Sequence, residues 1–435
     1  MGSTPYLRLL PLLLLLLPHP LIREYLSTNL LPKDVGVDAL HPIVLLPGVS
    51  CSNLEARLTE AYRPSTPHCG AMKGKGWFGL WENSSSLLAH NYVHCFKEQM
   101  SLVYDPTVND YRNRPGVETR VPNFGSAQGF HEKNPLHPEW CLTKLRDALE
   151  RIGYRDGETL FGAPYDMRYV PPLPGQPSEF YSRYFKQLMV LIENVSRKKQ
   201  REKVILFGHS FGGMVALEFV RNTPLAWRSR YIKHLILAAP VLSQGFIEPL
   251  KNLVSGPDML YVPTATAMSL RAMWRSFETA IMFLPSREVF RHKPLVITKK
   301  RNYTTYDMEE ILKAIGFSGG VQAFKRRALP NMLYFQAPMV PVTCINGVGN
   351  RTPQQLIYWD SNFSASPEFV YGDGDGKINL ISMLVFDEKM SQDPEQKKQY
   401  KSIKLHKAKH DTVITDECAL KRVIQEILGA NRISS

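Results

Sequence analysis

The chain has 435 residues, of which 44% are hydrophobic and 21% charged, so it can form a sizeable globular core. Lysine and arginine outnumber aspartate and glutamate by 53 to 40, which gives a formal net charge of +13 and favours anionic partners. The positive residues are spread along the chain without a nucleic-acid-binding pattern, so an acidic membrane surface is expected and a nucleic acid is not.

The N-terminal segment is a short apolar run behind one positive charge. Residues 9–17 follow Arg8 and are too few to span a bilayer comfortably. This pattern predicts a secretory signal peptide in residues 1–26, with a retained signal anchor as the alternative. Six cysteines and five Asn-x-Ser/Thr sequons fit that route. We therefore expect a protein of the secretory pathway that is secreted, vacuolar or lysosomal, or associated with the ER membrane.

The first half of the chain alternates between short apolar runs and helical periodicity. We expect strands at residues 41–46, 160–163, 204–207 and 235–239, an amphipathic helix over residues 181–200, and a buried helix directly after Ser210. Strands and helices that alternate at this spacing predict a parallel sheet covered by helices on both faces. The expected fold class is α/β.

The periodicity weakens in the second half. Methionine, aromatic and proline residues mix with basic clusters over residues 241–338, which we interpret as an inserted cap. The sheet is expected to resume at residues 340–349 and again at 368–371, and a C-terminal helix at 419–428. The predicted organisation is thus a first core part at 27–240, the cap at 241–338 and a second core part at 339–435.

One short motif indicates a catalytic serine. Gly208, His209, Ser210, Phe211 and Gly212 match the G-x-S-x-G nucleophile elbow, and they stand between a predicted strand and a predicted helix, as that motif requires. A serine on such a turn projects its hydroxyl above the sheet edge, where the start of the next helix stabilises negative charge. The alternative is a glycine-rich turn that only joins two elements.

A serine nucleophile needs a histidine base and a carboxylate, which in this fold follow it in the chain. Asp373 and Asp375 lie in a glycine-rich loop after a predicted strand, and His406 and His410 follow. The aspartates also resemble part of a calcium loop, but the further carboxylate and the flanking helices of an EF-hand are missing. The histidines, flanked by lysines, could alternatively form a solvated basic patch.

The expected reaction also requires an oxyanion hole. One donor should be the backbone N–H of Phe211, the residue after the nucleophile. The second should come from the loop after the first strand, which nominates the N–H of Val49.

Several motifs in order resemble the lecithin:cholesterol acyltransferase family, and the similarity covers nearly the whole chain from His41 onward. They are HPIVLLPGVSCSNLEARL, RVPNFG, GAPYDMRY, GHSFGG, the NYT after LPSREVF, CINGVG and YGDGDG. The resemblance implies an α/β-hydrolase core with a cap and a small membrane-binding lid, acting on glycerophospholipid acyl esters without a metal or other cofactor. It places the nucleophile on Ser210, the acid on Asp375, the base on His410 and the oxyanion donors on Val49 and Phe211.

The resemblance also implies a lid closed by a disulfide between Cys69 and Cys95. Trp77, Phe78, Leu80 and Trp81 stand in a glycine-broken segment inside this loop, which is atypical of a core. Exposed aromatic residues would suit a membrane interface, so Trp77, Phe78 and Trp81 are candidate lipid contacts. The alternative is that these aromatic residues pack under the cap.

Three positions depart from the family pattern. Cys51 stands where a glycine is usual in the oxyanion loop, and Lys377 replaces a usual threonine after the predicted acid. Cys344 matches a family half-cystine, but its expected partner is missing, so a bridge to Cys418 is a guess.

Together these features predict a serine esterase that removes a fatty acyl chain from a glycerophospholipid and passes it to a lipid alcohol, such as a sterol or an acylglycerol, or to water. The competing hypothesis is a catalytically silent lipid-binding or lipid-transfer protein that keeps the hydrolase fold.

Overall fold

A six-stranded parallel sheet forms the centre of the protein. The computed structural model describes residues 40–81, 92–130, 141–257 and 266–432, so the predicted signal segment at residues 1–26 lies outside the described residues. In spatial order the strands are β15 (Tyr400–His406), β12 (Val342–Val348), β9 (Ile232–Ala238), β8 (Val204–His209), β1 (Ile43–Leu46) and β7 (Leu160–Gly162). Each neighbouring pair is parallel. The α/β prediction is confirmed.

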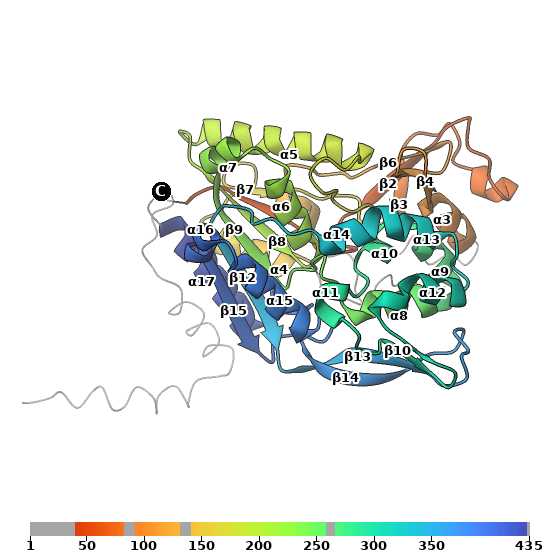
Figure 1. Cartoon of the computed structure of the whole chain (residues 1–435). Helices are drawn as coiled ribbons and strands as arrows, with labels where there is room; N and C mark the ends of the chain where they lie inside the picture. The colour runs from red at the N-terminus through yellow and green to blue at the C-terminus, as the bar shows by residue number, and fades with distance from the viewer. Residues whose placement is uncertain (1–39, 82–91, 131–140, 258–265, 433–435) are drawn as a thin grey trace, which may run out of the picture. The chain divides into compact units, whose positions relative to one another are not determined.

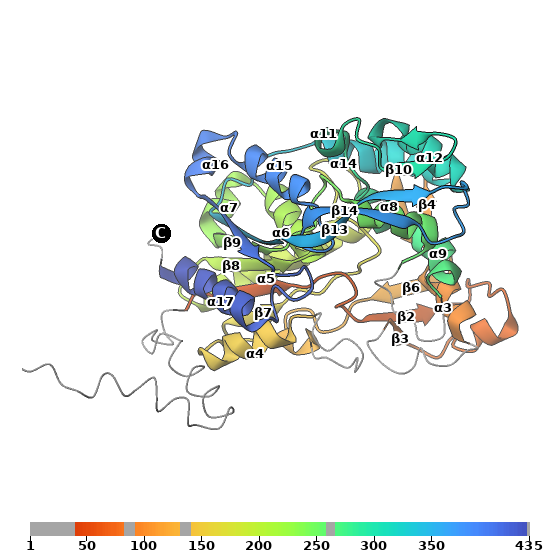
Figure 2. The ribbon, with the colours of Figure 1, turned by 90° about the horizontal axis from the view of Figure 1, so that it is seen from below.

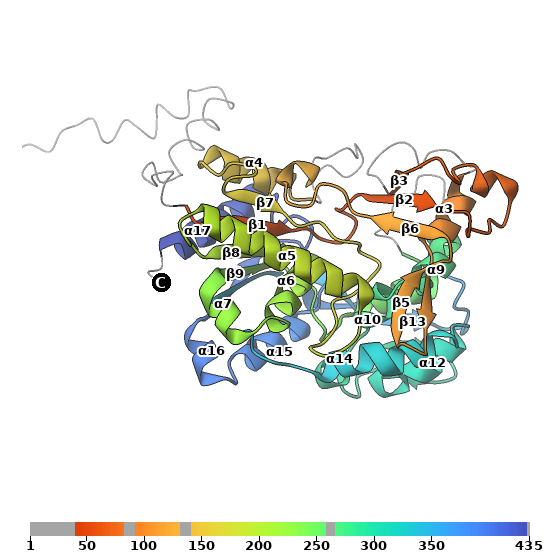
Figure 3. The ribbon, with the colours of Figure 1, turned by 90° about the horizontal axis from the view of Figure 1, so that it is seen from above.

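Helices cover both faces of this sheet, and the central strands are buried at every position. All residues of β1, β8 and β9 are buried, as expected for parallel strands with two covered faces. Figure 2 shows α4 (Thr143–Arg151) and α17 (Glu417–Arg432) over one face. Figure 3 shows α5 (Glu179–Lys198) over the other face, with α6 (Phe211–Arg221) and α7 (Leu225–Tyr231) on the same side. None of the helices in the described ranges is both long and apolar enough to cross a bilayer.

Most predicted elements of the central sheet are present, but one expected strand lies in another sheet and one strand was missed. The strand expected at residues 368–371 is β14 (Glu368–Gly374), but it pairs antiparallel with β13 (Asn350–Tyr358) in a separate sheet. The edge strand β15 was not anticipated from the sequence. Its lysines and its exposed or half-buried side chains give it no apolar run, and natural sheets use such charged residues to protect an edge.

The region predicted as a cap contains seven α-helices in its described part and shares a sheet with the later chain. They are α8 (Ile247–Ser255), α9 (Ala267–Ser276), α10 (Thr279–Met282), α11 (Arg287–Phe290), α12 (Met308–Ala314), α13 (Gly320–Ala323) and α14 (Leu329–Leu333). Strand β10 (Val296–Thr298) from this region pairs in parallel with β13, and Figure 1 shows α8 beside both strands. Through β10, the predicted cap region thus shares a sheet with the second core part.

A smaller sheet follows the first strand. It has the order β3 (Phe78–Trp81), β2 (Leu54–Leu58) and β6 (Val117–Arg120), and α3 (Tyr92–Met100) packs beside β3. The Cys69–Cys95 disulfide expected from the resemblance is present. A second disulfide, Cys51–Cys141, joins the loop after β1 to the segment before α4. Cys344 is a buried free thiol and Cys418 an exposed one, so the guessed bridge between them is wrong.

A buried ion pair connects the helical region to the rest of the protein. The Arg327 guanidinium lies in the π-helical turn η7 (Phe324–Ala328) and contacts the Glu278 carboxylate, and neither side chain is exposed. Arg327 also donates to the carbonyl oxygens of Asn109 (2.6 Å) and Pro177 (2.8 Å), while Glu278 accepts the N–H of Val170 at 2.9 Å. Burial raises the pKa of Glu278, and Arg327 opposes that shift.

Because removing one member of a buried pair leaves the other charge without compensation, Glu278→Ala should lower the free energy of unfolding by about 3–5 kcal/mol. The double variant Glu278→Leu/Arg327→Met should lose less, since neither charge of the pair remains, and Asp110, which lies 3.8 Å from Arg327, keeps its backbone donors Tyr111 and Glu179. Urea-induced unfolding followed by tryptophan fluorescence measures both values. Equal losses in the single and double variants would show that packing, and not the unpaired charge, sets the cost.

Candidate active site

Ser210 occupies a strained turn between β8 and α6. Its backbone angles are φ 55° and ψ −122°, a conformation that residues other than glycine rarely adopt. The turn is held by hydrogen bonds, because the Ser210 N–H donates to Ala238 O at 2.9 Å and Ser210 O accepts from the N–H of Val241 at 2.9 Å. The hydroxyl therefore stands at the carboxyl edge of the parallel sheet, where ligands bind in such folds.

The two glycines of the motif are required by close backbone approach. A Cβ on Gly208 would lie 2.4 Å from Gly212 O, and a Cβ on Gly212 would lie 2.2 Å from Leu46 O. Both contacts involve backbone atoms that cannot rotate away. The helix after Ser210 can pack this tightly against β1 and β8 only without side chains at these positions. This is the nucleophile elbow of an α/β hydrolase.

Three side chains that are distant in the chain form one hydrogen-bonded row. Ser210 Oγ lies 2.8 Å from His410 Nε2, and His410 Nδ1 lies 2.9 Å from Asp375 Oδ2. Ser210 is 8% exposed, His410 4% and Asp375 0%. With Nδ1–H donating to the carboxylate, Nε2 carries the lone pair that accepts the serine proton, as a general base requires.

Backbone hydrogen bonds hold Asp375 and His410 in place. Asp375 Oδ1 accepts the N–H groups of Lys377 (3.0 Å) and Ile378 (2.7 Å), and the His410 N–H donates to Asp375 O at 2.9 Å. Burial disfavours the imidazolium form of His410, but the Asp375 carboxylate outweighs burial and raises the His410 pKa above its usual 6.5. Asp375 thus both orients the His410 ring and raises its pKa.

The sequence left two pairs of candidates open, and the geometry separates them. Asp373 is exposed and its Oδ1 accepts the N–H of Gly349 at 2.6 Å, away from the row. His406 ends β15 and is exposed. Asp375 and His410 are the members of each pair that meet Ser210.

His209 is a functional candidate that sequence reasoning did not single out. Its Nε2 lies 3.2 Å from His410 O, and because a carbonyl oxygen only accepts, Nε2 carries the proton. Burial lowers the pKa of His209 to about 4, so the ring is neutral. His209 therefore supports the backbone of His410 through this hydrogen bond. Its position inside the G-x-S-x-G motif is the sequence feature that could have identified it.

The loop after β1 lies against Ser210. A Cβ on Gly48 would meet Ser210 Cβ at 3.2 Å, and Val49 lines the same cavity as Ser210. Phe211 is the first residue of α6, where backbone N–H groups lack an intrahelical acceptor. These positions suit two oxyanion donors, and we retain the N–H groups of Val49 and Phe211 as proposals.

Three contacts brace this loop, and the sequence revealed none of them. The Tyr165 hydroxyl donates to Pro47 O at 2.6 Å. The Trp81 indole N–H donates to Ser50 O at 3.1 Å. The Cys51–Cys141 disulfide follows directly. Cys51, which departs from the family pattern, is thus part of the loop's anchor.

The expectation that the lid segment lies outside the core is wrong for Leu80 and Trp81. Leu80 is 1% and Trp81 4% exposed, and both belong to the hydrophobic core, with Trp81 near Phe96. β3 pairs with β2, and the last two residues of β3 are both buried. Trp77 and Phe78 are half-buried, and Trp77 lies under the guanidinium of Arg120 at 4.4 Å. Only these two remain as proposed lipid contacts.

A cavity of about 60 Å³ opens beside the catalytic row. The predicted cap region supplies much of its apolar wall, through Val241, Phe246, Pro249, Trp274 and Phe283. Its polar lining includes Glu248, Lys377 and Asp411 in addition to Ser210 and His410. The sequence placed the cap in this region but did not show which side chains enter the cavity.

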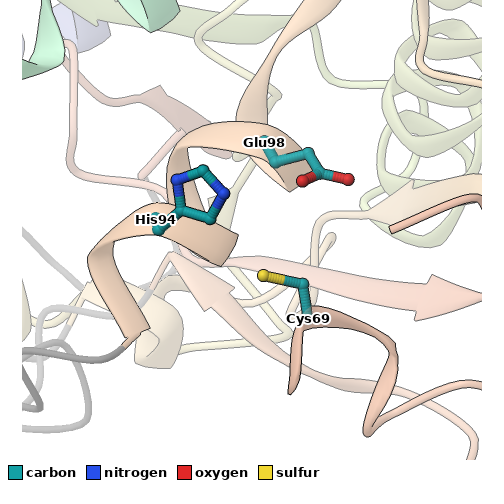
Figure 4. Close-up of side chains that lie close together, drawn as sticks. All are labelled: Cys69, His94 and Glu98. Atoms are coloured by element: carbon teal, nitrogen blue, oxygen red, sulfur yellow. The ribbon is translucent and has the colours of Figure 1, made fainter. Parts of the chain in front are cut away.

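Figure 4 shows a separate cluster in which the side chains of Cys69, His94 and Glu98 lie close together. The Cys69 sulfur is in a disulfide with Cys95, so it is not a thiolate ligand. Glu98 accepts hydrogen bonds from Tyr62 at 2.8 Å and from the Ser65 hydroxyl, which also contacts His94 at 2.8 Å. The side chains of Glu98 and His94 are thus already hydrogen-bonded within the protein, so the cluster fits a structural role in the lid.

Comparison with known proteins gives consistent matches. The family model for lecithin:cholesterol acyltransferase matches residues 77–326. Lecithin-cholesterol acyltransferase-like 1 of Oryza sativa subsp. japonica is 41% identical over 396 residues, 91% of this chain and 88% of that protein. Lysosomal phospholipase A and acyltransferase of Rattus norvegicus is 32% identical over 350 residues, 79% and 80% of the two chains. The solved structure of the Tle4–Tli4 complex covers 91% of this chain and 99% of its own, with a TM-score of 0.51 and 13% identity, which indicates a shared fold alone.

Asp375→Asn should reduce kcat by about 10⁴-fold, because an amide in place of the carboxylate favours the wrong His410 tautomer. Asp373→Asn is the matched control and should stay within about threefold of the parent, since it alters only an exposed hydrogen bond. Steady-state hydrolysis of p-nitrophenyl butyrate measures both. Comparable losses in the two variants would contradict the assignment of the acid.

Because the base must be neutral, the raised pKa of His410 predicts that kcat/KM falls as pH drops through a value above 6.5. The Asp411 carboxylate contributes to this rise, whereas Lys377 opposes it. In the pH profile for p-nitrophenyl butyrate, Asp411→Asn should move the acidic limb to lower pH and Lys377→Met to higher pH. Shifts of the same sign would show that the limb does not report His410.

Proposed function

The chain belongs to the lecithin:cholesterol acyltransferase family, and from this premise we propose a serine-dependent acyltransferase and phospholipase. It removes a fatty acyl chain from a glycerophospholipid through an acyl-Ser210 intermediate and passes it to a lipid alcohol or to water. The observation that carries this proposal is the row of Ser210, His410 and Asp375, joined at 2.8 Å and 2.9 Å in a covered cavity.

In the first half-reaction, His410 Nε2 accepts the hydroxyl proton while Ser210 Oγ attacks the ester carbonyl carbon. The Asp375 carboxylate stabilises the imidazolium that forms. The N–H groups of Val49 and Phe211 stabilise the negative oxygen of the tetrahedral intermediate. The intermediate collapses when His410 returns the proton to the leaving lysophospholipid oxygen, and the fatty acyl group stays on Ser210.

In the second half-reaction, an acceptor hydroxyl replaces the lysophospholipid. His410 removes its proton, the acceptor oxygen attacks the acyl-enzyme, and Ser210 recovers its proton from His410. Water yields a free fatty acid, while a sterol or an acylglycerol yields a new ester. The apolar walls from Phe246, Trp274 and Phe283 favour a lipid alcohol, because they limit the local water that competes for the acyl group.

The substrate is a membrane lipid, so the active site must meet a lipid surface. We propose that half-buried Trp77 and Phe78 in the disulfide-closed lid contact that surface. The net charge of +13 favours an anionic membrane. The two disulfides support an oxidising compartment of the secretory pathway.

A fluorophosphonate probe should label the protein covalently, and Ser210→Ala should abolish the label, because the activated hydroxyl is the reacting group. Wild-type protein that has not been treated with the probe should release fatty acid from acyl-radiolabelled phosphatidylcholine, or transfer it to a sterol or a diacylglycerol added to the same vesicles, and prior labelling should abolish both reactions. Thin-layer separation of the products identifies the acceptor.

A folded wild-type protein that is neither labelled nor able to turn over phosphatidylcholine would support the competing hypothesis of a silent lipid carrier. Circular dichroism of the same sample establishes that the protein is folded. Labelling that persists in Ser210→Ala would instead place the nucleophile elsewhere.

A further inference from the structure

A basic pocket lies outside the catalytic cavity, where the end of α5 meets α7. Its volume is about 220 Å³, compared with about 60 Å³ for the catalytic cavity. Figures 1 and 3 both show α7 beside one end of α5, and the two helices are in contact. We call it the arginine pocket, and the residues that line it are Glu193, Ser196, Arg197, Arg201, Arg230 and Tyr231.

The arginine pocket and the nucleophile lie at opposite edges of the central sheet. Helix α5 ends at Lys198, shortly before β8 begins at Val204, and Tyr231 directly precedes β9. Ser210 instead follows the last residue of β8. Because a strand rises about 3.3 Å per residue, the six residues of β8 separate the two edges by roughly 20 Å. The arginine pocket is therefore not part of the acyl-transfer site.

The three arginines in this pocket lack the acidic partners that other arginines have. Arg301, for example, is exposed and forms ion pairs with two carboxylates. The guanidinium groups of Arg197, Arg201 and Arg230 form no hydrogen bond or ion pair within the described part of the chain. Glu193 is the single carboxylate in the lining, so the pocket has two excess positive charges. Converging cations repel one another, and an anion is the ligand that this arrangement favours.

The helix dipole explains only one of these cations. Arg197 stands in the last turn of α5, where the dipole favours positive charge. Arg201 follows the helix, and Arg230 belongs to α7. Gln200 and Arg201 have φ values of 52° and 72°, in the left-handed region where a helix end usually has glycine. Such a conformation is strained for other residues, so the chain retains the Arg201 side chain at an energetic cost.

Two hydroxyl groups add donors to the lining. Ser196 is 3% exposed and Tyr231 is half-buried, and neither hydroxyl has a hydrogen-bond partner in the residues that the structure describes. The Arg230 guanidinium lies over the Tyr231 ring at 5.2 Å. The Glu193 carboxylate already accepts the Trp227 indole N–H at 2.8 Å. The pocket thus offers three cations and two hydroxyls to a ligand with several oxygen atoms.

A phosphomonoester has the chemistry that this lining favours. It carries a charge of about −1.5 to −2 at pH 7 and three strong acceptor oxygens, which matches an excess of two positive charges. Guanidinium groups bind phosphate oxygens through paired N–H donors. A volume of about 220 Å³ is below the roughly 300–1,000 Å³ of sites that hold drug-sized ligands, so it suits one such group and not an acyl chain.

We propose that the arginine pocket binds a phosphomonoester group through Arg197, Arg201 and Arg230, with the hydroxyls of Ser196 and Tyr231 as further donors. The group belongs either to a small soluble phosphate ester or to the headgroup of a phosphomonoester lipid, and both present the same atoms to the pocket. The site is non-catalytic and goes beyond the proposed acyl transfer. It also locates part of the net charge of +13 in one defined place.

Isothermal titration calorimetry of the wild-type protein with sn-glycerol 3-phosphate tests this site. Arg197→Met and Arg230→Met should each weaken binding by about tenfold or more, because each removes a charge-assisted contact with paired donors. Arg230→Lys keeps the charge but loses the paired donors, so its affinity should lie between those of the wild type and Arg230→Met. Dimethyl phosphate, a phosphodiester with a single charge, should bind the wild-type protein more weakly by about tenfold or more.

Lys198→Met is the matched control, because Lys198 directly follows Arg197, is exposed and does not line the pocket. It should leave the affinity for sn-glycerol 3-phosphate within about twofold of the wild type. Circular dichroism establishes that each variant is folded, so the test does not depend on acyl-transfer activity.

Vesicle flotation separates the two sources of the phosphate. It uses Ser210→Ala protein, which should not consume the lipids. Phosphatidylcholine vesicles carry a minor fraction of phosphatidic acid, a phosphomonoester, or the same fraction of phosphatidylglycerol, a phosphodiester. A preference for phosphatidic acid that Ser210→Ala/Arg230→Met loses assigns the pocket to a lipid headgroup. Equal retention on both vesicles, together with binding of sn-glycerol 3-phosphate, assigns it to a soluble ester.

Two results would overturn the proposal. One is folded wild-type protein that neither binds sn-glycerol 3-phosphate at millimolar concentration nor prefers phosphatidic acid vesicles. The other is equal weakening in Arg230→Met and Lys198→Met, which would show that diffuse positive charge attracts the anion and that the pocket does not recognise it.

Discussion

The left-handed turn at Ser210 is the constraint to which the rest of the site is fitted. A non-glycine residue with φ 55° is held there by hydrogen bonds to Ala238 and Val241, from the end of the neighbouring strand. The turn can approach β1 only because Gly208 and Gly212 lack side chains. Backbone strain at a nucleophile persists where the surrounding packing determines it fully, and here the buried parallel sheet supplies that packing.

The charged side chains near Ser210 are also stabilised by surrounding groups. The Asp375 carboxylate is completely buried, yet two backbone N–H groups and His410 surround it. Beside it, the half-buried Lys377 and Asp411 neutralise each other. Asp375, Lys377 and Asp411 thus have protein partners before a substrate arrives, as expected for a preorganised site.

The disulfide-closed lid contacts the loop after β1, which lies against Ser210. Trp81, expected at a lipid surface, is buried and donates to Ser50 O. The Cys51–Cys141 disulfide joins the same loop to the segment before α4. The Cys69–Cys95 lid thus extends from its half-buried outer residues, Trp77 and Phe78, to the backbone that we propose as an oxyanion donor.

Local sequence determined the elements whose signal is complete within a few residues. The sequence predicted the apolar strands β1, β8 and β9, the amphipathic helix α5 and the turn at Ser210. Each is recognisable from neighbouring residues, through the periodicity of apolar positions or the glycines that a tight turn requires. Candidates for the acid and the base were also visible as short motifs. The residues alone did not show which aspartate and which histidine to choose, since Asp373 resembles Asp375 and His406 resembles His410.

The family resemblance favoured Asp375 and His410, and the tertiary structure places both beside Ser210. It placed β14 in a second sheet, brought His410 to Ser210 across 200 positions, joined Cys51 to Cys141, and directed Glu248 and Lys377 into one cavity. Edge strands with charged residues, disulfide partners and cavity linings depend on contacts between segments far apart in the chain. No local pattern records such contacts, because their energy arises only when the segments meet.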